Sequence, residues 1–253
     1  MYDEFVGAEI PANLHFGYWS DGDDQVDLIA ASERLTELLI ERLAPAPGQR
    51  ILDLGCGVGG PAFSLARSCD VEVVGITVSD GQVAEAAARA QRGGLADRVR
   101  FELADAMDLP FDDASFDGAW FFESLLHVPD KERALSEAAR VLRPGSRLAV
   151  ADCFRRPGYD EPSEVVNCVD FGDYAPLLRG AGFTVLDIQD VTEHAVFPPA
   201  AQEQLREYIR LHPKIARLYG TSITNWLFRD EEGADERGRG GFPGYVLITA
   251  ERP

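Results

Sequence analysis

The sequence has few basic residues for its length. Its 253 residues include 24 lysines and arginines against 43 aspartates and glutamates, which gives a formal net charge of −19 at pH 7. A chain this acidic repels phosphate backbones and anionic lipid headgroups, and no run of lysines offsets the repulsion. The charge therefore argues against DNA, RNA and membrane surfaces as partners.

Histidine and cysteine are also scarce. The four cysteines show no C-x-x-C spacing, and the four histidines are scattered along the chain, so no metal-ligand cluster emerges. We expect reduced thiols in a cytoplasmic protein, and no metal. The sequence also lacks a charged-then-apolar leader and an apolar run of membrane-spanning length, so we expect neither export nor insertion.

Hydrophobic residues make up 45% of the chain, enough to bury a full core. The simplest organisation is one domain over residues 1–253, as a monomer or homodimer. Residues 24–43 carry apolar positions at helical spacing and predict a covering helix, so residues 1–44 are expected to form that helix and a lid.

Strands and helices are expected to alternate along most of the chain. Such alternation favours an α/β fold with a parallel sheet and helices on both faces. The expected strands cover residues 50–54, 71–79, 99–103, 118–122, 147–152, 184–191 and 245–251. The expected helices cover residues 62–67, 80–91, 130–142 and 199–219.

Two segments fall outside this alternation. Residues 153–169 contain Pro157, Gly158 and Pro162 and are expected to form a loop, whereas residues 192–220 include an extra helix. We expect both to form a cap over a substrate pocket. Residues 230–241 form a charged, glycine-rich connection to which we assign no function.

The most informative segment is Arg50 to Pro61, in which an apolar run ends in Asp53 and then in glycines. A buried strand that passes into a glycine turn and a helix is where adenosine-type cofactors bind. Gly55, Gly57 and Gly60 also satisfy the G-x-G-x-x-G pattern of nicotinamide enzymes. The end of the next strand argues against that interpretation, because Thr77 stands where a carboxylate for the ribose would be expected, about 20 residues on.

Further motifs make the chain similar to a known family. Residues 103–111 place Asp105 at a strand end, and Phe116-Asp117 opens another strand. With these residues, the chain resembles the class I S-adenosylmethionine-dependent methyltransferases. The small-molecule branch, which includes tocopherol, glycine-betaine-pathway and antibiotic-sugar methyltransferases, is indicated by His15-Phe16-Gly17-Tyr18-Trp19, Gly75–Ser79 with Gln82, and Glu123–Asp130.

This resemblance covers roughly residues 13–152 and implies a Rossmann-like sandwich with a mostly parallel seven-stranded sheet and a helical cap. It also implies S-adenosylmethionine as the methyl donor and S-adenosylhomocysteine as the product. The implied cofactor-binding residues are Tyr18, Asp53, Gly55, Cys56, Gly57, Gly59, Thr77, Gln82, Asp105 and Ala106.

Each donor contact has a structural alternative. Asp53 can accept from the donor's ammonium group or merely orient the turn, and Gln82 can bind the ribose with Thr77 or close a capping box with Ser79. Asp105 can accept from the adenine amine, beside the Ala106 amide, or act only as a turn residue. Tyr18 is expected to close over the sulfonium by cation-π attraction, whereas neighbouring aromatics are expected to pack.

His127 and Asp152 are the candidate catalytic residues. His127 follows the fourth strand, and an imidazole suits proton removal near neutrality, so it would deprotonate an acceptor hydroxyl; the alternative is a histidine that holds its own turn. Asp152 ends the fifth strand and could orient that imidazole, bind the acceptor or anchor the next loop.

The sequence thus predicts methyl transfer to a small molecule, with O-methylation in bacterial secondary metabolism favoured. Alternatives are N- or C-methylation, including that of an anionic isoprenoid that would bind Arg206, Arg210, Lys214 and Arg217, and a non-methylating cyclase on the same fold. Two further alternatives are a nicotinamide oxidoreductase, which Thr77 disfavours, and a module that binds the cofactor without chemistry. The basic residues of that helix could equally form a solvated face beside Glu203 and Glu207.

Overall fold

A single twisted sheet organises the chain in the computed structural model, which describes residues 15–20, 22–23, 26–156, 166–211 and 243–253. Five strands in the first two thirds of the chain run parallel to their neighbours: β1 (Arg50–Leu54), β2 (Glu72–Thr77), β3 (Val99–Leu103), β4 (Phe116–Phe122) and β5 (Leu142–Arg155). Two more, β7 (Thr184–Asp190) and β8 (Gly244–Glu251), complete the main path.

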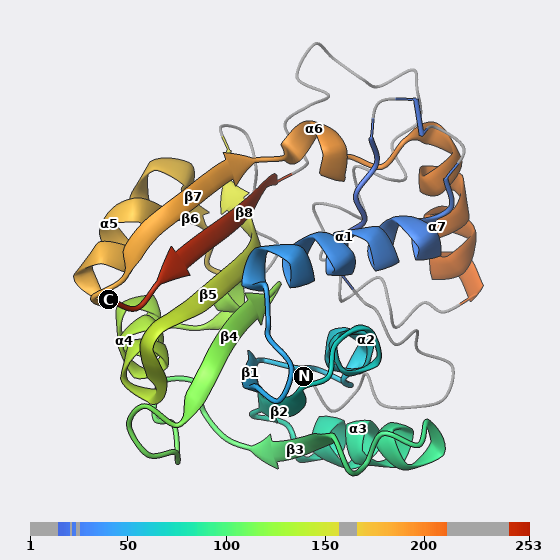
Figure 1. Cartoon of the computed structure of the whole chain (residues 1–253). Helices are drawn as coiled ribbons and strands as arrows, with labels where there is room; N and C mark the ends of the chain where they lie inside the picture. The colour runs from blue at the N-terminus through green and yellow to red at the C-terminus, as the bar shows by residue number, and fades with distance from the viewer. Residues whose placement is uncertain (1–14, 21, 24–25, 157–165, 212–242) are drawn as a thin grey trace.

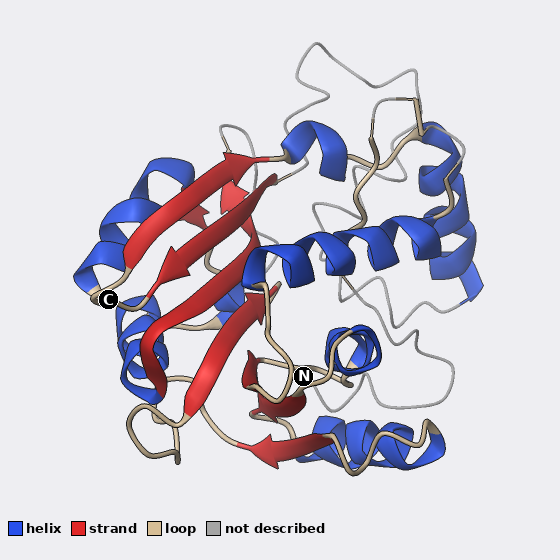
Figure 2. Ribbon diagram, viewed as in Figure 1, coloured by secondary structure: helices blue, strands red, loops and turns tan. Residues whose placement is uncertain are grey.

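The strand order is β3-β2-β1-β4-β5-β8-β7. Strand β8 is antiparallel to both β5 and β7, and the two-residue strand β6 (Val169–Asp170) pairs in parallel with the end of β5. The predicted mostly parallel α/β sheet is therefore confirmed (Figure 2). Because β1 to β5 are parallel, their carboxyl ends meet at one edge, where β1 lies between β2 and β4.

Helices cover both faces of the sheet (Figure 1). One core contains residues of α1 (Leu28–Leu43), α2 (Gly60–Ser68) and α7 (Pro199–Leu211), packed on Trp120 of β4. The other contains residues of α4 (Lys131–Val141) and α5 (Tyr174–Gly180), packed on Phe121. The remaining helices are α3 (Asp80–Arg92), the short α6 (Thr192–Ala195), and the 3-10 turns η2 (Leu125–His127) and η3 (Phe171–Asp173).

Side-chain caps fix where the helices begin. Asp27 accepts from Ala30 N at 2.8 Å, which starts α1 at Leu28 rather than at residue 24. Ser79 accepts from Gln82 N at 3.1 Å at the start of α3, and Asp130 accepts from Arg133 N at 3.0 Å at the start of α4. The caps place α3 and α4 directly after turns at the carboxyl edge of the sheet.

Strand β5 is longer than predicted. It begins at Leu142, where α4 ends, rather than at residue 147, and it continues to Arg155 because its antiparallel pairing with β8 extends to Phe154 opposite Gly244. The prediction of a loop over residues 153–169 was therefore wrong at both ends. Residues 157–165 lie outside the described residues, as do residues 230–241 and the part of the predicted 199–219 helix beyond 211.

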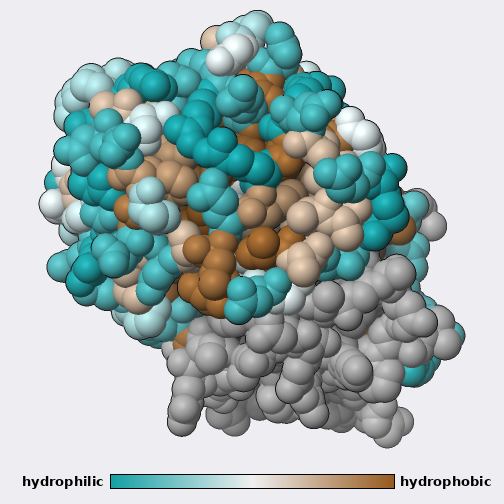
Figure 3. Space-filling model, turned by 90° about the horizontal axis from the view of Figure 1, so that it is seen from below, coloured by the Kyte–Doolittle hydropathy of each residue, from teal (hydrophilic) through white to brown (hydrophobic). Residues whose placement is uncertain are grey.

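Hydrophilic residues cover most of the face seen from below, and apolar residues gather in its middle (Figure 3). Among the described residues, no helix is both long and apolar enough to cross a membrane.

Candidate active site

A cavity of about 870 Å³ opens at the carboxyl edge of the parallel strands. Its wall is built from the segments that follow β1, β2, β3 and β4, together with His15 from the amino-terminal segment and Val166 and Asn167 after β5. The predicted residues that line it are Asp53, Gly55, Cys56, Gly57, Thr77, Gln82, Asp105, Ala106 and His127. The fold thus gathers one continuous set of predicted residues around a single space.

In the glycine turn after β1, hydrogen bonds to β2 fix the first residues, whereas Gly57 faces open space. Gly55 N and Cys56 N both donate to the carbonyl of Ile76, at 3.0 and 2.9 Å. A Cβ on Gly55 would overlap Ser124, whereas a Cβ on Gly57 would meet no atom within 4 Å. With φ near +52° and open space before it, Gly57 offers its backbone to whatever fills the cavity.

Asp53 presents an unsatisfied carboxyl oxygen beside this turn. It is 1% exposed and sits in register between Gly75 of β2 and Trp120 of β4. Burial raises its pKa to about 7, and the nearby Trp120 indole partly offsets the rise, although neither Oδ2 nor the indole Nε1 has a hydrogen-bond partner among the described residues. A buried carboxylate oxygen without a donor fits an incoming ammonium group.

Thr77 and Gln82 form a polar pair in the wall. The Thr77 hydroxyl donates to Gln82 Oε1 at 2.6 Å, and Ser79 N donates to Thr77 Oγ1 at 3.3 Å. Gln82 N donates to Ser79 Oγ, which is one of the two hydrogen bonds of a capping box. The Gln82 side chain instead accepts from the Thr77 hydroxyl. A linked hydroxyl and amide are therefore available at the end of β2.

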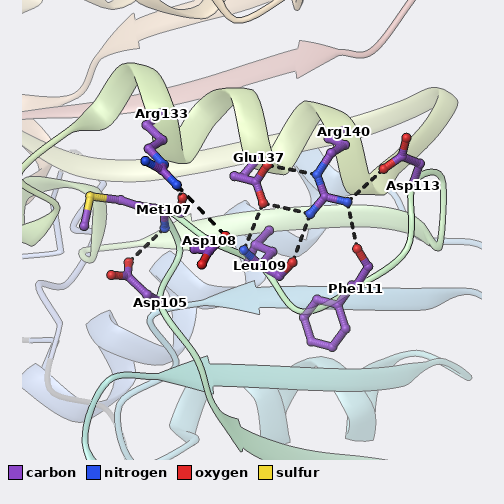
Figure 4. A network of polar contacts seen from close by, with 9 residues as sticks. All are labelled: Asp105, Met107, Asp108, Leu109, Phe111, Asp113, Arg133, Glu137 and Arg140. Carbon is purple, nitrogen blue, oxygen red and sulfur yellow. Dashed lines mark hydrogen bonds and ion pairs between the residues drawn. The ribbon is translucent and has the colours of Figure 1, made fainter.

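The loop after β3 places Asp105 and Ala106 at the other end of this wall. Asp105 accepts from Met107 N through Oδ1 at 2.8 Å, so it does serve its own turn (Figure 4). Asp105 also lines the cavity. The two predicted roles of Asp105 are thus compatible in the structure, because the turn uses one carboxyl oxygen.

An ion-pair network fastens this loop to α4 (Figure 4). Arg140 pairs with Glu137 at 2.7 Å and with Asp113 at 2.8 Å, and it donates to the carbonyls of Leu109 and Phe111. Glu137 also accepts from Leu109 N at 2.9 Å, and Arg133 donates to the Met107 carbonyl at 2.6 Å. The network holds in place the loop that carries Asp105 and Ala106.

His127 lines the cavity at the end of η2, but Asp152 does not. Asp152 is fully buried, and its oxygens accept from Leu126 N and Cys153 N, both at 2.8 Å. Burial raises its pKa to about 7. The geometry therefore shows Asp152 holding the turn that bears His127, which follows β4, rather than lining the cavity; the predicted anchor of the loop after β5 is represented by the Cys153 N contact.

Two further predicted residues lie away from the cavity lining. Tyr18 stacks on His194, with ring centroids 4.8 Å apart, and its ring is 5.9 Å from the Arg34 guanidinium carbon. Gly59 directly precedes α2 as its N-cap, where a Cβ would press on the rings of Phe63 and Phe101. The structure thus shows packing roles for Tyr18 and Gly59, because the amino-terminal segment runs along α1 and the helix start is covered by aromatics.

Sequence reasoning assigned no role to two cavity residues, His15 and Glu123. The His15 ring stacks on Phe122 at 4.1 Å, and Nδ1 lies 2.8 Å from the Phe16 carbonyl; burial lowers its pKa to about 4. Glu123 follows β4 with φ near +48°, rare for a residue with a side chain. Burial raises the Glu123 pKa to about 8. In the sequence, the two residues appeared only as members of the motifs His15–Trp19 and Glu123–Asp130, and Glu123 also stands at a strand end.

The comparisons with known proteins agree with this arrangement. Residues 52–150 match the family model described as a methyltransferase domain. The methyltransferase GfsG of Streptomyces halstedii is 37% identical over 99% of this chain and 91% of that protein. The 27-O-demethylrifamycin SV methyltransferase of Amycolatopsis mediterranei is 40% identical over 95% of this chain and 90% of that protein. The crystal structure of the [4+2]-cyclase SpnF superimposes with a TM-score of 0.80, covers 97% of this chain and 89% of its own, and is 36% identical.

The chain belongs to the class I S-adenosylmethionine-dependent methyltransferases. It is an enzyme of that class, and it has the Rossmann-like sandwich of the class. The residues present fit the donor's amino-acid group. The backbone at Gly57 faces open space, and Asp53 Oδ2 has no hydrogen-bond partner among the described residues and can accept from an ammonium group. The described residues contain no group of three or more His, Cys, Asp or Glu that could hold a metal ion.

Proposed function

We propose that this enzyme methylates a hydroxyl group of a small, largely apolar natural product. The observation that carries the proposal is one cavity in which the donor-binding residues and His127 share a wall. The 27-O-demethylrifamycin SV methyltransferase, whose name describes methylation at an oxygen, supports the choice of acceptor atom. Its source and that of GfsG support a bacterial natural-product pathway as the setting.

In this proposal, the donor lies along the sheet edge. Asp53 and the turn at Gly55, Cys56 and Gly57 hold its amino-acid end, and Thr77 with Gln82 holds its ribose. Asp105 and the Ala106 amide hold its adenine. Bound S-adenosylmethionine supplies an electrophilic methyl group.

The chain's own residues then orient and deprotonate the acceptor. Holding the two reactants in line supplies much of the rate gain in a direct displacement. His127 takes the hydroxyl proton, and Asp152 acts through the Leu126 amide to place the turn that bears His127. Residues 153–169 and 192–220 remain our candidates for a cap.

The acceptor is proposed to be uncharged. Phe122, Val128, Pro129 and Val166 give the cavity an apolar wall, and its described charged residues are the acids Asp53, Asp105 and Glu123. Arg206 pairs with Glu203 at 3.2 Å, and Arg210 with Glu207 at 3.6 Å, as expected for a solvated helix face. A prenyl diphosphate would find no described arginine or lysine in the wall.

A second candidate is cyclisation without methyl transfer, which the likeness to the [4+2]-cyclase SpnF motivates. Incubation with trideuteromethyl-labelled donor and a panel of hydroxylated macrolactones and terpenoid alcohols separates the two. Our proposal predicts a product in which a hydroxyl hydrogen is replaced by the labelled methyl, with one equivalent of S-adenosylhomocysteine. An isomerised, unlabelled product would favour the cyclase and overturn the proposed function.

A further inference from the structure

Glu123 occupies a distinctive position in the cavity wall. It directly follows β4, the strand beside β1 on the side opposite β2. Its Oε1 accepts from the Tyr245 hydroxyl of β8 and from Phe16 N of the amino-terminal segment, both at 2.7 Å. Its left-handed backbone is costly and is held by these surroundings.

The second carboxyl oxygen of Glu123 is available to a ligand. Oε2 has no hydrogen-bond partner among the described residues, yet it is not among their buried unpartnered atoms, and the residue lines the cavity. The carboxyl group is thus fixed through one oxygen, while the other neither bonds to a described residue nor is fully buried. A carboxyl group fixed in this way is suited, once ionised, to bind a positively charged group.

The order of the strands places this oxygen on the reacting side of the donor. With the adenine near β3, the ribose near β2 and the amino-acid end near β1, the sulfur lies between the ends of β2 and β1, and we place its methyl toward the end of β4, the next strand that borders the cavity. This placement rests on the proposed function. The methyl donor carries a positive sulfonium there, whereas the product carries a neutral thioether.

We propose that Glu123 recognises the sulfonium as a carboxylate and gives up its proton to solvent when S-adenosylmethionine binds. The protonated carboxyl and the donor become a carboxylate–sulfonium pair plus one proton released to buffer. S-adenosylhomocysteine lacks the positive charge and leaves the carboxyl protonated. Glu123 therefore discriminates donor from product, which share every other group.

The groups around Glu123 favour the protonated state before the donor binds. Burial raises its pKa to about 8, with Asp152 of β5 adding to the rise, while Tyr245 and Phe16 N lower it. Cys153 lies on β5 beside it, and His15 and His127 face the same cavity. At neutral pH a nearby cation is then needed to ionise the carboxyl.

Calorimetric titration in buffers of different ionisation enthalpy measures the protons released on binding. In the wild type at pH 7, S-adenosylmethionine should release about 0.9 proton more than S-adenosylhomocysteine. Protons released by Asp53 cancel in this difference, because both ligands carry the same ammonium. The affinity ratio of donor to product should rise about 25-fold between pH 6.5 and 8.5.

Glu123→Gln should remove the difference in protons and the pH dependence of the ratio while retaining S-adenosylhomocysteine binding. The matched control Glu72→Gln, at the amino end of β2, should keep both. Tyr245→Phe, which removes one donor to the carboxylate, should move the rise of the ratio to higher pH. If Glu123→Gln fails to fold, the pH at which the affinity ratio rises in Tyr245→Phe still tests the inference.

Equal proton release by the two ligands in the wild type would overturn the inference and leave the proposed function intact. The inference would also be overturned if Glu123→Gln kept the difference in protons released by the two ligands. The same holds if the affinity ratio of donor to product rose over the same pH range in Tyr245→Phe as in the wild type. If neither ligand binds the wild type, the proposed function fails together with the inference.

Discussion

The backbone N–H of Leu126 donates a 2.8 Å hydrogen bond to Oδ2 of the fully buried Asp152. Leu126 directly precedes His127 in η2, so the end of β5 fixes the turn that brings the imidazole to the cavity. Both oxygens of the Asp152 carboxyl group accept from backbone N–H groups here, whereas the amide of an asparagine offers only one acceptor oxygen.

Asp152→Asn is therefore expected to loosen the His127 turn. Its amide nitrogen must face one of the two N–H groups, and a buried donor without a partner costs about 1–3 kcal/mol. We predict that loss in the free energy of unfolding, measured with denaturant, and a lower turnover at unchanged cofactor affinity. Wild-type turnover in a variant destabilised by that amount would show that the turn does not position His127.

His127→Ala tests the proposed base. Loss of a general base should lower the single-turnover rate about 10²–10⁴-fold with little change in donor affinity. The wild-type rate should rise with pH as the imidazole loses its proton, and the variant should lose that rise. Rates within a few-fold of wild type at every pH from 6 to 9 would leave His127 as a packing or orienting residue.

Asp105→Ala is expected to weaken S-adenosylmethionine and S-adenosylhomocysteine equally. One hydrogen bond to a charged acceptor is lost, about 1.5–3 kcal/mol by calorimetry. Asp108→Ala is the matched control, because Asp108 belongs to the same turn and pairs only distantly with Arg133, at 4.0 Å. Equal losses in the two variants would mean that the turn, rather than the Asp105 contact, sets the affinity.

The unliganded protein should lose stability as pH rises from 6.5 to 8. Asp53, Asp152 and Glu123 have pKa values raised by burial to about 7, 7 and 8, so the folded state holds protons that the unfolded state has already lost. Each group lowers the free energy of unfolding by up to about 1.4 kcal/mol per pH unit while it stays protonated.

Denaturant titrations across this range measure the slope. His15, whose pKa burial lowers from 6.5 to about 4, raises stability with pH mainly below pH 6.5, and its remaining contribution at the lower end of the range is smaller than that of the three carboxyl groups. Glu123→Gln should flatten the slope, and Glu72→Gln should not. A stability that is constant or rises between pH 6.5 and 8 would contradict the protonation states assigned to these carboxyl groups.

The sequence predicted the sheet and the glycine turn because both depend on local signals. An apolar run ending in Asp53 and glycines defines β1 and its turn, and the pattern around Thr77 and Gln82 is equally local. The long β5 was missed because its extent is set by pairing with β8, about a hundred residues later in the chain.

The rest of the site depends on contacts between distant segments. Glu123 becomes distinctive only when Tyr245 and Phe16 contact it, and the Tyr18 ring stacks on the distant His194 and does not line the cavity. No spacing of residues in the sequence predicts these contacts between distant segments. Acidic residues at strand ends can be predicted from the sequence as candidate site residues. The structure is needed to show that Asp53 lines the cavity and that Asp152 does not.

If the donor occupies the space before the glycine turn, Gly57→Val should exclude it. A valine at Gly57 would fill the open space at the turn, at some cost in backbone strain, since φ is near +52°. Gly94→Val is the matched control, because Gly94 also has a positive φ, near +65°, and open surroundings, but it follows α3 away from the cavity.

The decisive measurement is calorimetric titration of S-adenosylmethionine into the wild type and these two folded variants. We predict binding to the wild type and to Gly94→Val, with binding abolished in Gly57→Val. Unchanged affinity in Gly57→Val would contradict the placement of the donor against this turn.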